Sequence, residues 1–299
     1  MRAETARRLQ AARTPRLARS PVRWRAVPAG AWAAVCALIA CLFAFPIVMV
    51  AMTAVKSPDE AAASPPTYFP HELSLGNFSD LLHAGSGLLT YMGNSTGVAL
   101  GTVAGTVVLG TLAGYGFGRF SFRGRNSLFV TVLATMMIPF QAILTPLYTI
   151  LFHLDLLDSR LGLVLVYTTF QMPFSVFIMR NAFRHLPLDI EEAAMVDGAG
   201  TPLILFRVMI PLVVPGIATV ALFAFFTSWN EFLAALIVVS SNTKYTLPVL
   251  LQNLITERFG ALDWGMLEVG VVVTIVPCLL IFFILQRYYV QGLLAGAGK

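Results

Sequence analysis

The sequence predicts an all-α membrane protein with six transmembrane helices. Of its 299 residues, 57% are hydrophobic and only 12% are charged, whereas about a quarter of the residues in a soluble domain carry a charge. Six long uncharged runs can each hold one helix, which needs about 20 residues to cross ~30 Å of hydrocarbon. The short alternating strands of a membrane barrel do not occur in the sequence, so we expect helical spans.

The uncharged runs give the order of these spans. They cover residues 26–55, 81–118, 126–154, 161–179, 208–230 and 269–286. Proline occurs in each of the last four, at Pro139 and Pro146, Pro173, Pro215 and Pro277. Proline removes a helical hydrogen bond, and neighbouring helices tolerate the resulting bend in a membrane. We therefore expect bent helices in this part of the bundle.

Glycine recurs at intervals of four in the second span. The positions are Gly97, Gly101 and Gly105, followed by Gly110, Gly114 and Gly118. Residues four apart lie on one helix face, where glycine lets a second helix approach closely. The pattern predicts a packing groove and leaves a pore-lining stripe as the alternative.

Basic residues gather on one side of the predicted spans. Sixteen of the 20 lysines and arginines lie in the N-terminal tail or after the second, fourth and sixth spans. The positive-inside rule then places both termini in the cytoplasm. This asymmetry accounts for the net charge of +5 without a nucleic-acid partner. We expect the arginine-rich tail, residues 1–28, to anchor the topology, with lipid-headgroup contact as the alternative.

A charged stretch with small side chains, EEAAMVDGAG at residues 191–200, lies between the fourth and fifth spans. Pro187 suits the first turn of a helix, and the acidic residues that follow suit its N-terminal end. Gly198 and Gly200 permit a left-handed backbone and end this helix, and Thr201 caps the next one. We predict a helix, a glycine turn and a second helix at the cytoplasmic face.

The first of these helices is expected to present a face with alanine at its centre. Ile190, Ala193, Ala194 and Asp197 are spaced to share this face. An amphipathic helix on lipid usually carries large apolar residues and a basic polar face, and this stretch fits that pattern poorly. Small residues beside acids fit a groove on another protein better, so docking is favoured over the interfacial alternative.

The stretch also resembles a motif of ATP-binding-cassette importer permeases. The motif, E-A-A, three residues, Gly, nine residues and hydrophobic–x–hydrophobic–Pro, comprises here Glu192, Ala193, Ala194, Gly198, Val208, Ile210 and Pro211. The segments SPPTYFPHELSLGNFSDLL, NSTGVAL, GYGFGRFSFRGRN, SWNEFL and QRYYVQGLLAGAGK are similar to the carbohydrate-uptake branch, specifically to the second permease subunit of the maltose transporter. The resemblance covers nearly the whole chain.

The resemblance implies a MetI-like permease core with a cytoplasmic coupling helix. The core would be residues 91–291 with spans two to six, preceded by a first helix within 29–55 and an extracytoplasmic loop at 56–90, and followed by a cytoplasmic tail at 292–299. The motif loop would be residues 185–211. Its ATPase-coupling residues would be Glu191, Glu192, Ala193, Ala194, Asp197, Gly198 and Pro211.

The resemblance also implies the partners. A second related permease subunit would complete the pore, two ATPase subunits would bind on the cytoplasmic side, and a solute-binding protein would deliver solute from outside the bacterial inner membrane. The chain would be a transport subunit without a cofactor, not an enzyme. The sequence lacks the G-x-x-x-x-G-K-[ST] loop that cradles ATP phosphates, so ATP would be used by the partner chains.

An acid follows the fifth span in the segment SWNEFL. If the fifth helix starts near Leu212, Glu231 lies ~28 Å along it, at the external interface. With Trp229 and Asn230, it is a candidate for lining the outer mouth where solute enters. The alternative is an interfacial acid that simply reaches water.

Two other classes of function are less favoured. A secondary transporter normally has ionisable groups at the midplane or a repeated fold, and neither is evident. A membrane enzyme would need facing carboxylates or clustered His and Cys, but the four His and three Cys are scattered without metal-ligand spacing. The branch suggests a sugar, an oligosaccharide or a related polyol as the solute, with a glycerol phosphate as the alternative.

Overall fold

The structure is a computed structural model that describes residues 29–256 and 263–297. Every regular element within these ranges is helical, as predicted. The chain divides into two compact units, residues 1–47 and 48–299. The arginine-rich tail, residues 1–28, lies outside the described residues, so its role stays a prediction.

The first unit contains most of α2 (Ala29–Ala54), the first predicted span. Its segment Gly30–Ala54 is long and apolar enough to cross a membrane. Leu38, Leu42 and Phe43 all expose their side chains on this helix. Exposed large apolar residues of this kind are expected where lipid or another subunit covers a helix.

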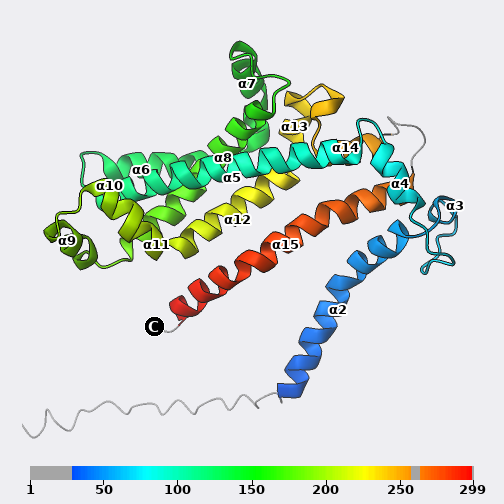
Figure 1. Cartoon of the computed structure of the whole chain (residues 1–299), viewed down its shortest axis with the longest axis horizontal. Coiled ribbons are helices and arrows are strands. Elements are labelled where there is room, and N and C mark those ends of the chain that lie inside the picture. Colours follow the sequence, from blue (N-terminus) through cyan, green and yellow to red (C-terminus); the bar gives the residue numbers. More distant parts are fainter. Residues whose placement is uncertain (1–28, 257–262, 298–299) are drawn as a thin grey trace, which may run out of the picture. The chain divides into compact units, whose positions relative to one another are not determined.

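The second unit is built around two parallel helices, α5 (Leu88–Arg119) and α8 (Arg160–Arg184), which Figure 1 shows side by side. Gly101 of α5 faces Val164 of α8, and Gly118 faces Phe183 further along. Residue numbers therefore rise in the same direction on both helices. One further span must return the chain between them.

The glycine groove is confirmed at five of its six positions. Gly101, Gly105, Gly110, Gly114 and Gly118 all lie against α8, and an added Cβ at each would meet an α8 side chain or backbone atom within 3.1 Å. Gly97 has nothing within 4 Å of such a Cβ, so it is not part of the contact. Close packing of two helix backbones is the role of this stripe.

The third span is broken at the place where proline predicts a bend. It consists of α6 (Arg125–Ala134), the 3₁₀ turn η1 (Thr135–Met137) and α7 (Phe140–His153). The two parts meet at 102°, and Pro139 precedes the first residue of α7. Pro146, in contrast, lies inside α7. This bent pair returns the chain from the end of α5 to the start of α8.

The fifth span is also bent. The short helices α10 (Thr201–Leu203) and α11 (Ile210–Leu212), with the π-helical turn η2 (Ile204–Met209) between them, lead into α12 (Val214–Asn230) at 78°. Helix α12 packs against α5, α8 and α15 (Trp264–Ala297). Because α15 continues to Ala297, the predicted tail that starts at residue 292 is helical in its described part.

Six spans fit the described ranges. Four helices are individually long and apolar enough to cross a membrane, and the two bent pairs raise the number to at most six. The first, second, fourth and sixth predicted spans correspond to single helices. The third and fifth are the broken ones, because proline interrupts the hydrogen bonding of the helix there.

The second unit has two ends, which lie on opposite sides in Figure 1. The α9 end is the one at which α9 (Asp189–Val196) follows α8. The loop end carries the short elements α3 (Pro58–Ala61), α4 (Gly76–His83), α13 (Leu233–Val238), η3 (Asn242–Lys244) and α14 (Leu247–Ile255).

Asp158 ties two connections together at the loop end. Its carboxylate accepts hydrogen bonds from the Ser241 backbone N–H at 2.9 Å and from the Lys244 ammonium at 2.8 Å. Burial acts to raise the pKa of Asp158, but the hydrogen bonds from Lys244, Ser241 and Ser240 outweigh it and hold that pKa well below its usual range. The connection before α8 is thereby fixed to η3.

Candidate functional site

Helix α9 forms from the predicted stretch, with small shifts at its ends. It begins at Asp189, two residues after Pro187, and carries three acids in its first turn. Gly198 has φ +81° and ends the helix in the left-handed region, as predicted. Gly200 differs from expectation, because its φ of −75° is ordinary extended backbone preceding α10, which begins at Thr201.

The two adjacent glutamates of α9 have different environments. Glu191 is buried, and its Oε2 lies 3.2 Å from Nε of Arg119, the last residue of α5. The side chains of Arg119 and Glu191 are only 5% and 7% exposed. Arg119 also donates a hydrogen bond of 2.9 Å to the Leu186 carbonyl, in the connection before α9. Glu192 is exposed.

One side of α9 packs on its own chain. Ala194, together with Ala199 from the turn that follows, contacts a buried cluster that we call the α9-end cluster. The cluster consists of Tyr115, Met179, Phe183, Ile204, Leu205, Met209, Val213 and Val220. The expectation that Ala193 and Ala194 together centre the free face is therefore wrong. Successive helical residues point about 100° apart, so only Ala193 faces outward.

The part of α9 that its own chain leaves uncovered, which we call its free side, carries both apolar and acidic side chains. Val196 is 88% exposed and Met195 is 59% exposed. Glu192, Asp189 and Asp197 are also exposed. Exposed apolar side chains with carboxylates beside them are typical of a surface that another protein covers.

Pro211 lies within the joint that connects α9 to the fifth span. It is in α11, directly after the π-helical turn η2. Proline has no N–H to donate to the preceding turn, which accounts for an irregular helix at this point. Ile204 and Met209 of the same turn belong to the α9-end cluster, so this joint is packed rather than loose.

Trp229 does not line an outer mouth. Its side chain is 1% exposed, its Nε1 donates a hydrogen bond of 3.1 Å to the Thr274 carbonyl of α15, and its ring stacks on Phe225 at 5.3 Å. The expectation for this residue is wrong, because α15 covers the face of α12 on which it lies. Trp229 holds α12 and α15 together.

Glu231 also has a structural role that its position in the sequence does not reveal. Helix α12 stops at Asn230, and the Glu231 carboxylate accepts hydrogen bonds from the backbone N–H of Ala234 at 3.0 Å and from the Tyr167 hydroxyl at 2.6 Å. Tyr167 is seven residues into α8, or ~10 Å from its start. Glu231 therefore caps the start of α13 and links it to α8, and its place at the external interface stays a prediction.

Asn230 is the one residue of the predicted outer-mouth set that is exposed rather than buried or half-buried. Its amide donates a hydrogen bond of 2.8 Å to the Phe226 carbonyl, one turn earlier in α12. Thr227, three residues before it, is also exposed. Residues three apart lie on the same side of a helix, so α12 has a polar exposed strip near its end.

A cavity of ≈ 510 Å³ opens beside this strip. Its walls come from η1 and the residues around it, from the middle of α8 and from α12. Polar groups are few and include Thr169, Gln171 and Thr227 among mainly apolar residues such as Phe174 and Phe223. Within the described ranges, no three His, Cys, Asp or Glu side chains are grouped to hold a metal ion.

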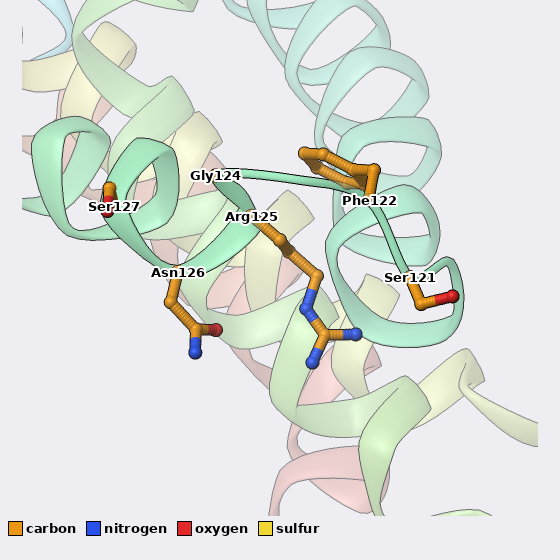
Figure 2. A pocket seen from close by; sticks show the side chains of 6 residues that line it. All are labelled: Ser121, Phe122, Gly124, Arg125, Asn126 and Ser127. Atoms are coloured by element: carbon orange, nitrogen blue, oxygen red, sulfur yellow. The ribbon is translucent and has the colours of Figure 1, made fainter.

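A second cavity, of ≈ 310 Å³, lies at the connection between α5 and α6. In Figure 2, the Phe122 ring lies on one side of the connecting segment, and the side chains of Arg125 and Asn126, from the first turn of α6, extend on the other. Arg125 donates a hydrogen bond of 3.0 Å to the Phe120 carbonyl. None of the residues that line this cavity was predicted as a site residue. The guanidinium of Arg125 gives it a positive charge.

Known proteins with similar sequences include transport permeases. The chain is 34% identical to the sulfoquinovosyl glycerol transport system permease protein of Agrobacterium fabrum, over 85% of this chain and 88% of that protein. It is 32% identical to the arabinooligosaccharides transport system permease protein of Halalkalibacterium halodurans, over 88% of this chain and 94% of that protein.

The fold and the family agree with these similarities. The crystal structure of a bacterial ABC transporter involved in the import of the acidic polysaccharide alginate contains a chain with the same fold, with a TM-score of 0.75 and 22% identity over 87% of this chain and 95% of that one. Residues 106–294 match the family described as binding-protein-dependent transport system inner membrane component. The chain belongs to this family of transport subunits.

Proposed function

We propose that the chain is one of two permease subunits of an ATP-driven importer for a sugar, an oligosaccharide or a related polyol. Membership of a binding-protein-dependent family supports import with a solute-binding protein. The named relatives carry a sulfoquinovosyl glycerol and arabinooligosaccharides, which supports a carbohydrate solute. The secondary-transporter alternative has no support from this family.

The observation that carries the proposal is the free side of α9. Val196 and Met195 expose apolar surface that no element of the described residues covers. A cleft on an ATPase subunit would bury them, and Glu192 would pair with a basic residue at its edge. An exposed ion pair contributes only ~0–1 kcal/mol, so the apolar contact is the main source of affinity.

The α9 end is the cytoplasmic one in this proposal. The basic residues at that end lie in α5, in the connection after it, in α6, in α8 and in η2: Arg119, Arg123, Arg125, Arg184 and Arg207. The positive-inside rule favours the cytoplasm for such residues. Both termini then lie inside, the loop end faces the solute-binding protein, and ATP is used by the two partner ATPases.

A second permease subunit would complete the pathway beside the bend in the third span. Met137 and Ile138 expose their side chains there, and the ≈ 510 Å³ cavity opens next to them. Large exposed apolar residues at a bend suit a subunit contact. Asn230 and Thr227 would then lie on the solute path, whereas Trp229 and Glu231 would support it from behind.

The test is uptake by the purified complex in liposomes. The complex is isolated through a tag on this chain and supplied with its solute-binding protein, with Mg·ATP enclosed. Labelled arabinotriose, maltotriose, glycerol and glycerol 3-phosphate are the probes. We expect uptake of one of the first three that requires both Mg·ATP and the binding protein. Uptake driven by an ion gradient without ATP would contradict the proposal, and uptake of glycerol 3-phosphate alone would contradict its carbohydrate part.

A further inference from the structure

The ion pair between Arg119 and Glu191 occupies a position that docking alone does not explain. Glu191 points into the chain, away from the free side of α9 on which Val196 lies. A carboxylate that served only as a solvated charge or a docking contact would be exposed, as Glu192 is. The buried pair therefore joins α9 to another part of the same molecule.

Arg119 is placed to hold α9 at two points. It is the last residue of α5, where the negative end of the helix dipole favours a cation. Its guanidinium contacts Glu191 inside α9 and donates to the Leu186 carbonyl just before α9. The position and direction of α9 are thus defined by the end of α5, although about 70 residues of chain separate them.

The pair is protected from water. Both side chains are more than nine-tenths buried, and Tyr115, one helical turn before Arg119, lies beside Glu191. A buried pair is strongly resistant to opening, because separation would leave an uncompensated charge in a medium of low dielectric constant. The contact is suited to stay closed while α9 moves.

Movement of the end of α5 has to move α8 as well. Gly114 and Gly118 allow α5 to approach Met179 and Phe183 of α8 so closely that an added Cβ at either glycine would meet α8 atoms. Tyr115 adds an edge-to-face contact with Phe183 at 5.3 Å. The two helices therefore behave as one body near the α9 end.

We infer that the Arg119–Glu191 pair transmits the displacement of a docked α9 to the α5–α8 pair. Glu191 and Arg119 are positioning residues, and the inference rests on the proposed docking of α9 to an ATPase. It separates the roles of two adjacent acids: Glu192 faces the partner, and Glu191 carries the movement inward.

Hydrogen–deuterium exchange on the whole importer complex tests this inference, with Mg·ATP as the probe. Exchange is measured with and without Mg·ATP in peptides from α9 and from the last two turns of α5. In the unmodified protein, Mg·ATP should change exchange in both peptides. In Glu191→Gln, the α9 peptide should still respond, whereas the response of the α5 peptide should fall by about half or more, because the buried contact between them is lost.

Two further variants distinguish transmission from a general loss of structure. The exchange of the two charges, Arg119→Glu with Glu191→Arg, should restore part of the α5 response. Asp158→Asn removes an ion pair at the loop end and should leave the response of both peptides unchanged. If the Glu191→Gln protein does not insert into the membrane, Glu191→Asp is the substitute. Its shorter side chain keeps the negative charge but places it farther from Arg119, so the α5 response should be intermediate.

The outcomes separate the inference from the proposed function. An α5 response in Glu191→Gln equal to that of the unmodified protein would overturn the inference, as would an α5 peptide that never responds while α9 does. A charge exchange no better than the single variant would overturn it too. If α9 itself fails to respond to Mg·ATP in the unmodified complex, the docking proposal fails, and the inference fails with it.

Discussion

At the scale of single residues, the contact between α5 and α8 depends on glycine at particular positions. Gly114 lies directly against Met179 and the Arg180 backbone, whereas Gly97 has open space around it on the same helix. The two glycines are equivalent in the sequence pattern. Only the structure distinguishes a packed glycine from an unpacked one.

This difference gives a matched pair of substitutions. Gly114→Ala should destabilise the protein by about 1–3 kcal/mol, because an extra methyl group in a close helix contact forces the backbones apart. Gly97→Ala should be neutral or stabilise the protein by up to ~1 kcal/mol, because alanine is the better helix former. Thermal unfolding in detergent measures both. Equal midpoints for the two variants would show that α5 and α8 are not in close contact.

Residue patterns in the sequence predicted the coupling stretch but not the roles within it. The left-handed turn at Gly198 was predictable because glycine favours that conformation. The burial of Glu191 was not, because its partner Arg119 is far away in the chain. Likewise, Trp229 is a tryptophan near the end of an apolar run, which is typical of a residue at the membrane interface. Only the packing of α15 against α12 shows that it is buried.

At the scale of elements, the carboxylate of Asp158 holds two connections together at the loop end. Asp158 accepts hydrogen bonds from Ser240, Ser241 and Lys244, which joins the start of α8 to η3. The Asp158 and Lys244 side chains are partly exposed. Solvent therefore screens this contact, and its contribution to the free energy of unfolding is modest.

The lowered pKa of Asp158 predicts a definite dependence on pH. The contact stabilises the folded state above the unfolded-state pKa of about 3.9 and is lost as the pH falls through the lower folded-state pKa. Asp158→Asn should therefore reduce the free energy of unfolding by about 1 kcal/mol at pH 7.

Comparing the stabilities of Asp158→Asn and the unmodified protein at low pH tests the direction of the pKa shift. The difference between Asp158→Asn and the unmodified protein should be constant from pH 7 to pH 5 and should shrink below about pH 4, where the unfolded-state carboxyl takes up its proton. Unfolding midpoints across this range are the measurement. A difference that grows as the pH falls would contradict the assigned contact.

The bend in the third span could be predicted from the sequence, whereas the break after α12 could not. Proline at position 139 marks the bend of the third span. The break after α12 has no such marker, because it depends on Glu231 meeting Tyr167 and the start of α13. A contact between residues of separate helices leaves no local signal.

At the scale of the whole molecule, the orientation in the membrane can be tested directly. A single cysteine at Thr243, at the loop end, should react with a membrane-impermeant thiol reagent in intact cells. A single cysteine at Arg123, at the α9 end, should react only after the membrane is opened, because the basic end lies inside. Both residues are exposed, so access to the reagent is limited only by the membrane. The reverse pattern would contradict the proposed topology.

The overall architecture was predictable because it follows from composition and periodicity. Long apolar runs define spans, and the glycine interval predicts which span forms the central contact. The motif that runs from Glu192 to Pro211 indicated the family, which the match over residues 106–294 confirms. Which side of α9 is free was not predictable, because it depends on how α9 lies on the α9-end cluster.

The most direct test of the central claim is photo-cross-linking from the free side of α9. A photoreactive amino acid replaces Val196 in one sample and Leu112, an exposed residue of α5, in the other, and the adducts in cell membranes are identified by mass spectrometry. We predict an adduct between position 196 and an ATPase subunit, and none from position 112. Adducts from position 196 only with lipid or with unrelated proteins would contradict the account.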